Sequence, residues 1–187
     1  MAENRFEILE TPISGLMRVE RKQIGDERGY LSRLYDRETL AGAGLGAIVQ
    51  INHTMTSARG TVRGMHFQLP PHAEDKLVTC LSGAVFDVAV DLRAGSPTFL
   101  AWHGERLSAH NRFALLIPKG FAHGFQALTD DCELLYLHSA AHEPAAEGAL
   151  NATDPALGID WPMPITGLSA SDKAHPLLAP DFAGIRL

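Results

Sequence analysis

Short apolar runs, repeated along the whole chain, constrain its fold more than any other feature. Runs rich in Val, Ile, Phe and Leu alternate with Gly, Pro and Asp at intervals of about ten residues, a spacing typical of antiparallel β-sandwiches and β-barrels. The sequence therefore predicts an all-β protein in which loops and tight turns connect many short strands.

The individual elements can be placed from the same pattern. Helix is expected only in a short piece capped by Asp36 and running to Leu40, and a second short turn is expected at 109–112. Residues 140–164 contain Pro, Ala and Gly without periodicity and are expected to be a loop wrapping the barrel. The expected strands cover residues 15–22, 29–35, 48–56, 61–68, 76–82, 84–93, 99–107, 113–117, 124–127 and 132–139.

Length and charge limit the class of protein. A chain of 187 residues, 45% of them hydrophobic, predicts one domain spanning residues 1–187, with terminal extensions packed on the barrel. A net charge of −6 argues against a nucleic-acid binder and against a protein of anionic membrane surfaces. The start of the chain lacks the apolar core of a signal peptide, and no run of about 18 apolar residues is present, so a cytoplasmic protein is expected. Cys80 and Cys132 are then expected to be reduced.

The segment from Arg63 to Lys76 carries the clearest chemistry. It sets His66 between two cations, and Tyr136 lies on a later strand. Moving a proton next to a ketone requires a neutral base, a positive charge near the carbonyl oxygen, and an acid on the opposite face of the carbon. His66, Lys76 and Tyr136 can fill these roles, although a single histidine on a strand is more often a packing or surface residue.

Strand parity makes two of these placements testable. Arg63 and His66 have opposite parity, so both reach one cavity only if the strand bends, and Gly64 is the natural place for the bend. Asp87 and Asp91 share one face of their strand, which either meets solvent or lines a polar cavity. Parity favours solvent, because carboxylates are seldom buried without a partner.

Several sequence blocks between about residue 8 and about residue 178 match, in the same order, the motifs of a known family. They are residues 25–29 (GDERG), 49–53 (VQINH), 63–68 (RGMHFQ), 76–78 (KLV), 86–93 (FDVAVDLR), 96–99 (SPTF), 117–125 (IPKGFAHGF), 135–136 (LY) and 154–162 (DPALGIDWP). Together they resemble the dTDP-4-dehydrorhamnose 3,5-epimerase family. The resemblance implies a cupin-type jelly-roll barrel with a few short helices. It also implies a homodimer in which each subunit lends residues to its partner's nucleotide pocket.

The resemblance further implies roles for particular residues. The substrate would be a nucleotide-linked 4-keto-6-deoxyhexose, epimerised at C3, C5 or both without a metal or redox cofactor. His66 would be the base, oriented by an aspartate; Lys76 would stabilise the enolate, and Tyr136 would return a proton. The implied catalytic residues are thus His66, Asp172, Lys76 and Tyr136. The implied substrate-binding residues are Arg28 and Arg63 at the diphosphate, Asp87 close to the lysine, and Gln50, Asn52 and His123. The implied place of Asp87 favours a polar cavity over solvent for its face of the strand.

The chain departs from the family pattern at the nucleotide end. Arg33 stands where the family has a glutamate, and Leu137 stands where it has a lysine. Ala141 and His142 replace a pair of tyrosines, and Ala152 replaces a tryptophan. Loss of an aromatic platform removes roughly 1–3 kcal/mol of base stacking. These changes predict an altered nucleotide preference or an altered choice between C3 and C5.

Three other classes of protein remain open at this point. A metal-dependent cupin would use a His-x-His pair, but here His66 is followed by Phe67 and Gln68. A nucleotide-sugar-binding module without catalysis would explain the altered nucleotide end. A purely structural cupin would leave the arginines as ordinary surface cations.

Overall fold

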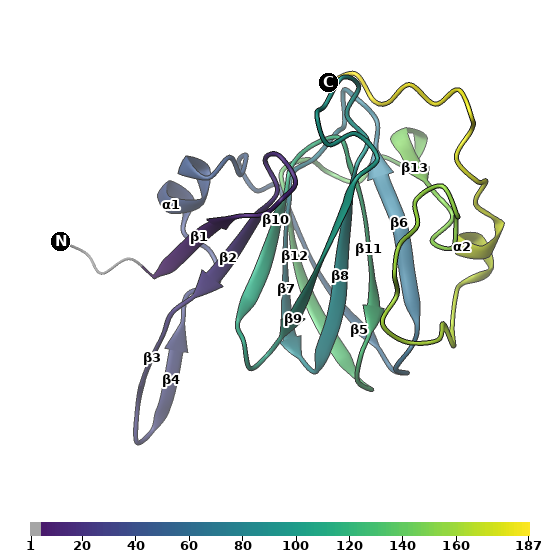
Figure 1. The fold of residues 1–187 in the computed structure, drawn as a ribbon. Coiled ribbons are helices and arrows are strands. Elements are labelled where there is room, and N and C mark those ends of the chain that lie inside the picture. Colours follow the sequence, from purple (N-terminus) through teal and green to yellow (C-terminus); the bar gives the residue numbers. More distant parts are fainter. Residues whose placement is uncertain (1–4) are drawn as a thin grey trace.

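Two facing antiparallel sheets form the body of the molecule, as the computed structural model shows for residues 5–187 (Figure 1). The six-stranded sheet has the order β1 (Phe6–Glu10), β2 (Met17–Arg21), β10 (Phe113–Ile117), β7 (Lys76–Ser82), β12 (Cys132–His138), β5 (Gln50–Thr56). The five-stranded sheet has the order β13 (Glu147–Ala149), β6 (Val62–Gln68), β11 (Phe121–Ala127), β8 (Ala84–Asp91), β9 (Trp102–Ser108). This arrangement confirms the predicted cupin-type jelly roll.

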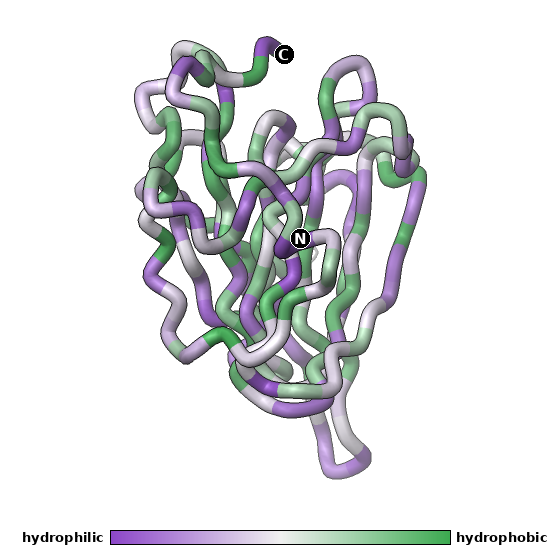
Figure 2. Tube along the Cα trace, turned by 90° about the vertical axis from the view of Figure 1, so that its right-hand side faces the viewer, coloured by the Kyte–Doolittle hydropathy of each residue, from purple (hydrophilic) through white to green (hydrophobic). Residues whose placement is uncertain are grey.

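A small hairpin and three short helical segments complete the chain. The hairpin of β3 (Gln23–Asp26) and β4 (Gly29–Ser32) projects from the body and ends in a hydrophilic tip (Figures 1 and 2). The helical segments are α1 (Arg37–Gly42), the 3-10 turn η1 (Pro144–Ala146) and α2 (Ala170–Ala174). None of the helices among the described residues is long and apolar enough to cross a bilayer.

The main core lies between the two sheets. Alternate residues of each strand point inward, so apolar side chains of β7, β10 and β12 meet those of β8, β9 and β11. The buried members of this core are Ile13, Leu16, Val78, Cys80, Val85, Ala89, Leu107, Leu115, Ile117, Phe121, Phe125, Ala127, Cys132 and Leu134. These apolar side chains fill part of the space between the sheets, and the remaining part is polar.

The outer faces of both sheets are covered by terminal segments. α1 covers the outer face of the six-stranded sheet, where its Leu40 shares a cluster with Phe6 of β1 and Leu116 of β10. The C-terminal part of the chain runs over the five-stranded sheet beside β6 (Figure 1), where Leu157 and Ile185 join the cluster around Val88. The strands are thus apolar on both faces, which accounts for their nearly continuous hydrophobic runs.

The structure corrects several element boundaries. β1, β3 and α2 were not predicted, and the strand expected to reach residue 35 ends at Ser32. The strand expected from residue 99 starts at Trp102, because Leu100 has a positive φ of 61° that an extended strand does not accommodate. The predicted loop 140–164 contains η1 and the three-residue β13, whose pairing with β6 is a tertiary contact without a local signal. The expected domain begins at residue 1, but residues 1–4 lie outside the described part.

Candidate active site

A cavity of about 250 Å³ opens between the two sheets. Its walls come from β5, β7 and β12 on one side and from β6 and β11 on the other, with the segment after β12 at its rim. The lining residues are Gln50, Asn52, Thr54, Arg63, His66, Phe67, Gln68, Glu74, Lys76, His123, Gly124, Phe125, Tyr136, His138, His142 and Glu147. Seven of the ten residues singled out from the sequence are among them: Gln50, Asn52, Arg63, His66, Lys76, His123 and Tyr136.

A bulge in β6 lets Arg63 and His66 face the same cavity. In the pairing of β6 with β11, His66 is opposite His123 and Arg63 is opposite Phe125, so β6 has one extra residue over this stretch. Gly64 lies in the bulge with a φ of +121°. The bend expected from the parity of Arg63 and His66 is therefore present at the predicted glycine.

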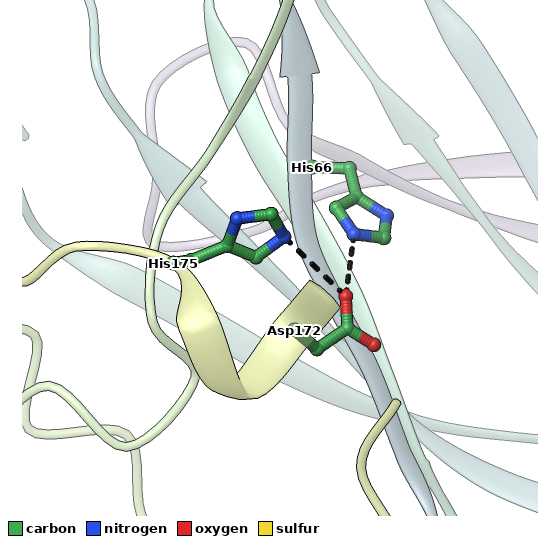
Figure 3. A group of neighbouring side chains, drawn as sticks. All are labelled: His66, Asp172 and His175. Carbon is green, nitrogen blue, oxygen red and sulfur yellow. Dashed lines mark hydrogen bonds and ion pairs between the residues drawn. The ribbon is translucent and has the colours of Figure 1, made fainter. Parts of the chain in front are cut away.

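His66 is held by Asp172 from the C-terminal part of the chain (Figure 3). His66 Nε2 lies 2.8 Å from Asp172 Oδ1, which leaves Nδ1 of the ring as the second nitrogen. Ser169 caps α2 by accepting the backbone N–H of Asp172, and this fixes the start of the helix that carries the carboxylate. A second imidazole, that of His175, lies with its Nε2 3.5 Å from the same oxygen.

His123 and Tyr136 form a second group, behind which Asp87 is fully buried. His123 Nε2 lies 2.8 Å from Asp87 Oδ1, and the rings of His123 and Tyr136 meet edge to face at 5.9 Å. Burial, reinforced by the charge of Asp87, raises the pKa of Tyr136 well above its usual range. The phenol therefore keeps its proton, as an acid requires.

The solvent-facing position that strand parity alone favours for Asp87 and Asp91 is wrong, and Asp87 has the polar surroundings that the resemblance implies. Both side chains are buried, Asp87 against His123 and Asp91 in hydrogen bonds with Arg93, Ser96 and Thr98. Each carboxylate has a partner from a neighbouring segment, which strand parity does not reveal.

Lys76 is held by Glu74. Lys76 Nζ lies 3.1 Å from Glu74 Oε1, and His138 Nδ1 lies 2.8 Å from Glu74 Oε2. Burial opposes ionisation of Glu74, but the hydrogen bond from His138 and the charge of Lys76 outweigh it, so the pKa of Glu74 lies below its ordinary value. His138 also stacks on Tyr136, with ring centroids 6.0 Å apart. Lys76 is thus paired with Glu74, whereas Asp87, the acidic residue expected near it, is paired with His123.

The sequence did not single out Glu74 and His138. One signal was available, because His138 shares a face of β12 with Tyr136 and must therefore point the same way. Glu74 precedes β7 and carries no such signal.

Arg28 lies away from the cavity of its own chain. It is at the exposed tip of the β3–β4 hairpin, where its guanidinium pairs with Asp26. The hairpin projects from the body of the molecule (Figure 1), so this side chain is available to another molecule rather than to its own site.

The residues that depart from the family pattern lie in different parts of the structure, and one of them lines the cavity. Arg33 pairs with Asp36 at the start of α1, 3.1 Å away, and Leu137 is buried on the outer face of its sheet. Ala152 is buried under the C-terminal segment. Of the pair 141–142, His142 lines the cavity, where it adds an imidazole to the rim.

Comparisons with known proteins show the family to which the chain belongs. The family model described as dTDP-4-dehydrorhamnose 3,5-epimerase matches residues 10–180. The chain is 44% identical to dTDP-4-dehydrorhamnose 3,5-epimerase of Salmonella typhimurium, across 91% of this chain and 94% of that protein. It is 42% identical to dTDP-4-dehydrorhamnose 3-epimerase of Streptomyces niveus, across 89% and 81%.

A solved structure shows the same fold. The crystal structure of dTDP-4-dehydrorhamnose 3,5-epimerase from Bacillus anthracis, with TDP and PPi bound, superposes with a TM-score of 0.89 at 37% identity. The match covers 92% of this chain and 99% of that one. On its sequence, its fold and the family match, the chain belongs to the dTDP-4-dehydrorhamnose 3,5-epimerase family.

Proposed function

We propose that the protein is a cofactor-independent epimerase of a nucleotide-linked 4-keto-6-deoxyhexose that inverts C3, C5 or both. The observation that carries this proposal is the placement of an imidazole and a phenol on opposite walls of one cavity. His66 comes from β6 in one sheet, Tyr136 comes from β12 in the other, and both line one cavity with Lys76. A sugar ring between the sheets would meet an imidazole on one face and a phenol on the other.

The side chains support a two-step exchange of protons. The 4-ketone acidifies the hydrogens on C3 and C5, and His66 takes one of them through Nδ1 while Asp172 stabilises the imidazolium. The electron pair of the broken C–H bond moves to the ketone oxygen, where the ammonium of Lys76 offsets the charge. Tyr136 then gives its proton to the other face of the carbon and the ketone re-forms. Solvent reprotonates the tyrosinate and accepts the proton held by His66.

The nucleotide end of the substrate would extend toward the rim. Arg63 lines the cavity and can meet a phosphate, and Gln50 and Asn52 supply amides on β5. His142 stands at the rim where the family has a tyrosine. A nucleotide base at this position would therefore stack on an imidazole ring in place of a phenol ring. Relatives include both a 3,5-epimerase and a 3-epimerase, and either outcome suits this site.

A homodimer would complete the site. β5 is an edge strand of its sheet, and the apolar side chains of Val49, just before it, and of Ile51 and Met55 within it are exposed by 61%, 61% and 53%. Ile24, Tyr30 and Leu31 of the projecting hairpin are exposed as well. Covering these side chains with a second copy would remove apolar surface from water and would bring Arg28 to a phosphate in the partner's cavity.

Deuterium exchange tests the proposed activity. Incubation with dTDP-4-keto-6-deoxyglucose in deuterated water is expected to introduce deuterium at C3, C5 or both, as measured by mass spectrometry and NMR. A panel of sugars on different nucleotides then establishes the preferred base. If the nucleotide sugars bind but no carbon exchanges, the protein is a binding module and the catalytic proposal fails. If exchange disappears on treatment with a chelator, the reaction depends on a metal.

A further inference from the structure

Asp172 has a second imidazole partner that the proton-transfer chemistry does not use. His175, at the end of α2, places Nε2 3.5 Å from the same Oδ1 that His66 Nε2 meets at 2.8 Å. The two imidazole nitrogens and the carboxylate oxygen all lie within 4.8 Å of one another, and Figure 3 shows both rings turned toward that oxygen. His175 is absent from the cavity lining, and the reaction described above gives it no step.

Two imidazoles and one carboxylate are a ligand set that suits Zn²⁺. Zinc binds imidazole nitrogen and carboxylate oxygen at about 2.0–2.2 Å in tetrahedral geometry, so ligand atoms are spaced by about 3.4 Å. The two separations at Asp172, 2.8 and 3.5 Å, bracket that spacing. The two imidazole nitrogens lie within 4.8 Å of each other, so rotation of the two rings would bring all three ligand atoms around an ion.

Burial also fits a metal site with an open position. The Asp172 side chain is 6% exposed, whereas those of His66 and His175 are 39% and 25% exposed. An ion can reach the buried carboxylate from solvent between the two rings. Its fourth ligand would be water, as at zinc sites with three protein ligands.

We propose that His66, Asp172 and His175 bind Zn²⁺, and that the bound ion inhibits the enzyme. Without metal, His66 keeps its proton on Nε2, facing Asp172, and offers the lone pair of Nδ1 to the substrate. When zinc takes the Nε2 lone pair, the ring proton moves through solvent to Nδ1. That nitrogen is then a donor and cannot accept a proton from carbon. The inhibition rests on the proposed epimerase function, whereas the binding does not.

Calorimetry tests the binding. Chelator-treated full-length protein is titrated with ZnCl₂, and one ion per chain is expected to bind. His175→Ala is expected to weaken this binding by about tenfold or more. The matched control is His53→Ala, which removes another imidazole paired with a carboxylate, Glu133, but outside the cavity. It is expected to bind zinc like the wild type. MgCl₂ is expected not to bind at this site, because Mg²⁺ prefers oxygen ligands.

Deuterium exchange tests the consequence. Zinc is expected to suppress exchange in the wild type and in His53→Ala, EDTA is expected to restore it, and His175→Ala is expected to remain active in zinc. His175→Gln serves as a second variant if alanine disturbs α2, with circular dichroism as the check on folding. The proposal is overturned if zinc does not saturate at one ion per chain, if either His175 variant binds it as tightly as the wild type, or if anomalous scattering places the ion elsewhere. If no deuterium enters any sugar, calorimetry and anomalous scattering still test the zinc site. The proposed epimerase activity and the proposed zinc binding can therefore be rejected independently.

Discussion

At the scale of single residues, three of the polar side chains that line the cavity are each held by a carboxylate. Asp172 holds His66, Asp87 holds His123, and Glu74 holds Lys76. A carboxylate is costly to bury unless it is paired, and breaking such a pair costs more than forming it gains. These pairs therefore fix orientation and protonation more than they add stability.

Replacing Asp172 with Asn tests the pair at the base. The amide cannot stabilise a protonated His66, so the rate of deuterium exchange at the sugar carbon is expected to fall by roughly 10²–10⁴-fold. The far-ultraviolet circular dichroism is expected to stay unchanged. Asp181→Asn, at an exposed position, is the control and is expected to keep full activity. Unchanged turnover in Asp172→Asn would show that Asp172 does not support the base.

Tyr136→Phe tests the acid. The variant is expected to exchange deuterium into the substrate without giving full inversion, because His66 can remove and return a proton on its own face only. Since the pKa of Tyr136 is raised, its neutral form persists to higher pH. The variant should therefore lack the most alkaline phase of tyrosinate absorbance seen in the wild type. Equal yields of inverted product from both proteins would assign the acid elsewhere.

Glu74→Gln tests the carboxylate beside Lys76. The pKa of Glu74 is depressed in the fold, so its ionised form stabilises the protein above the ordinary carboxyl pKa, and this contribution is lost as pH falls through the depressed value. At pH 7 the variant is expected to be about 1–3 kcal/mol less stable to urea. The difference from the wild type should shrink as the pH is lowered below the ordinary carboxyl pKa. Glu27→Gln, on the exposed hairpin, provides the control, and a pH-independent difference would contradict the assignment.

At the scale of elements, the bulge in β6 decides which side chains share the cavity. A Cβ added at Gly64 would lie 2.5 Å from Gly124 Cα and 2.8 Å from His123 O, and the backbone there has a φ of +121°. Both contacts are with backbone, so a side chain cannot be accommodated by a change of rotamer. The glycine, the bulge and the shared orientation of Arg63 and His66 depend on one another.

Gly64→Ala is accordingly expected to lose about 2–4 kcal/mol of stability in urea unfolding, together with most of the activity. Gly42→Ala is the matched control. A Cβ at Gly42 meets nothing within 4 Å, and Gly42 lies in α1, so this change is expected to stabilise by up to about 1 kcal/mol. Equal stability of the two variants would mean that the bulge relaxes without cost.

Local pattern predicted the elements well where burial imposes a repeat, and poorly elsewhere. β7, β10 and β12 lie at the centre of the six-stranded sheet, and their apolar runs gave their positions within a residue. β13 and the short α2 depend on a neighbour for their stability. Neither contains enough residues to show a period of its own.

At the scale of the whole molecule, the projecting hairpin and the exposed edge of β5 bear on the proposed homodimer. A site shared between subunits can be tested by mixing two inactive proteins, His66→Ala and Arg28→Ala. If Arg28 acts in the partner's cavity, one site of each mixed dimer is intact, and unfolding and refolding the mixture is expected to recover about a quarter of wild-type activity. A mixture no more active than its separate components would place Arg28 outside the partner's site. Sedimentation of the wild type supplies the oligomeric state.

The sequence by itself determined the all-β fold, the bend at Gly64 and most of the reactive side chains. The alternation of apolar and polar residues along a strand, the glycines at bends and the chemistry of single side chains are all local properties that can be read from the sequence. Only the tertiary structure decided which carboxylate meets which base. It brought Asp172 to His66 and Asp87 to His123, whereas Glu74 stands two residues before Lys76 and His175 stands three residues after Asp172. The pairs of Asp172 with His66 and of Asp87 with His123 join residues 106 and 36 positions apart. They form through the packing of the C-terminal segment and through sheet register, which no local pattern encodes.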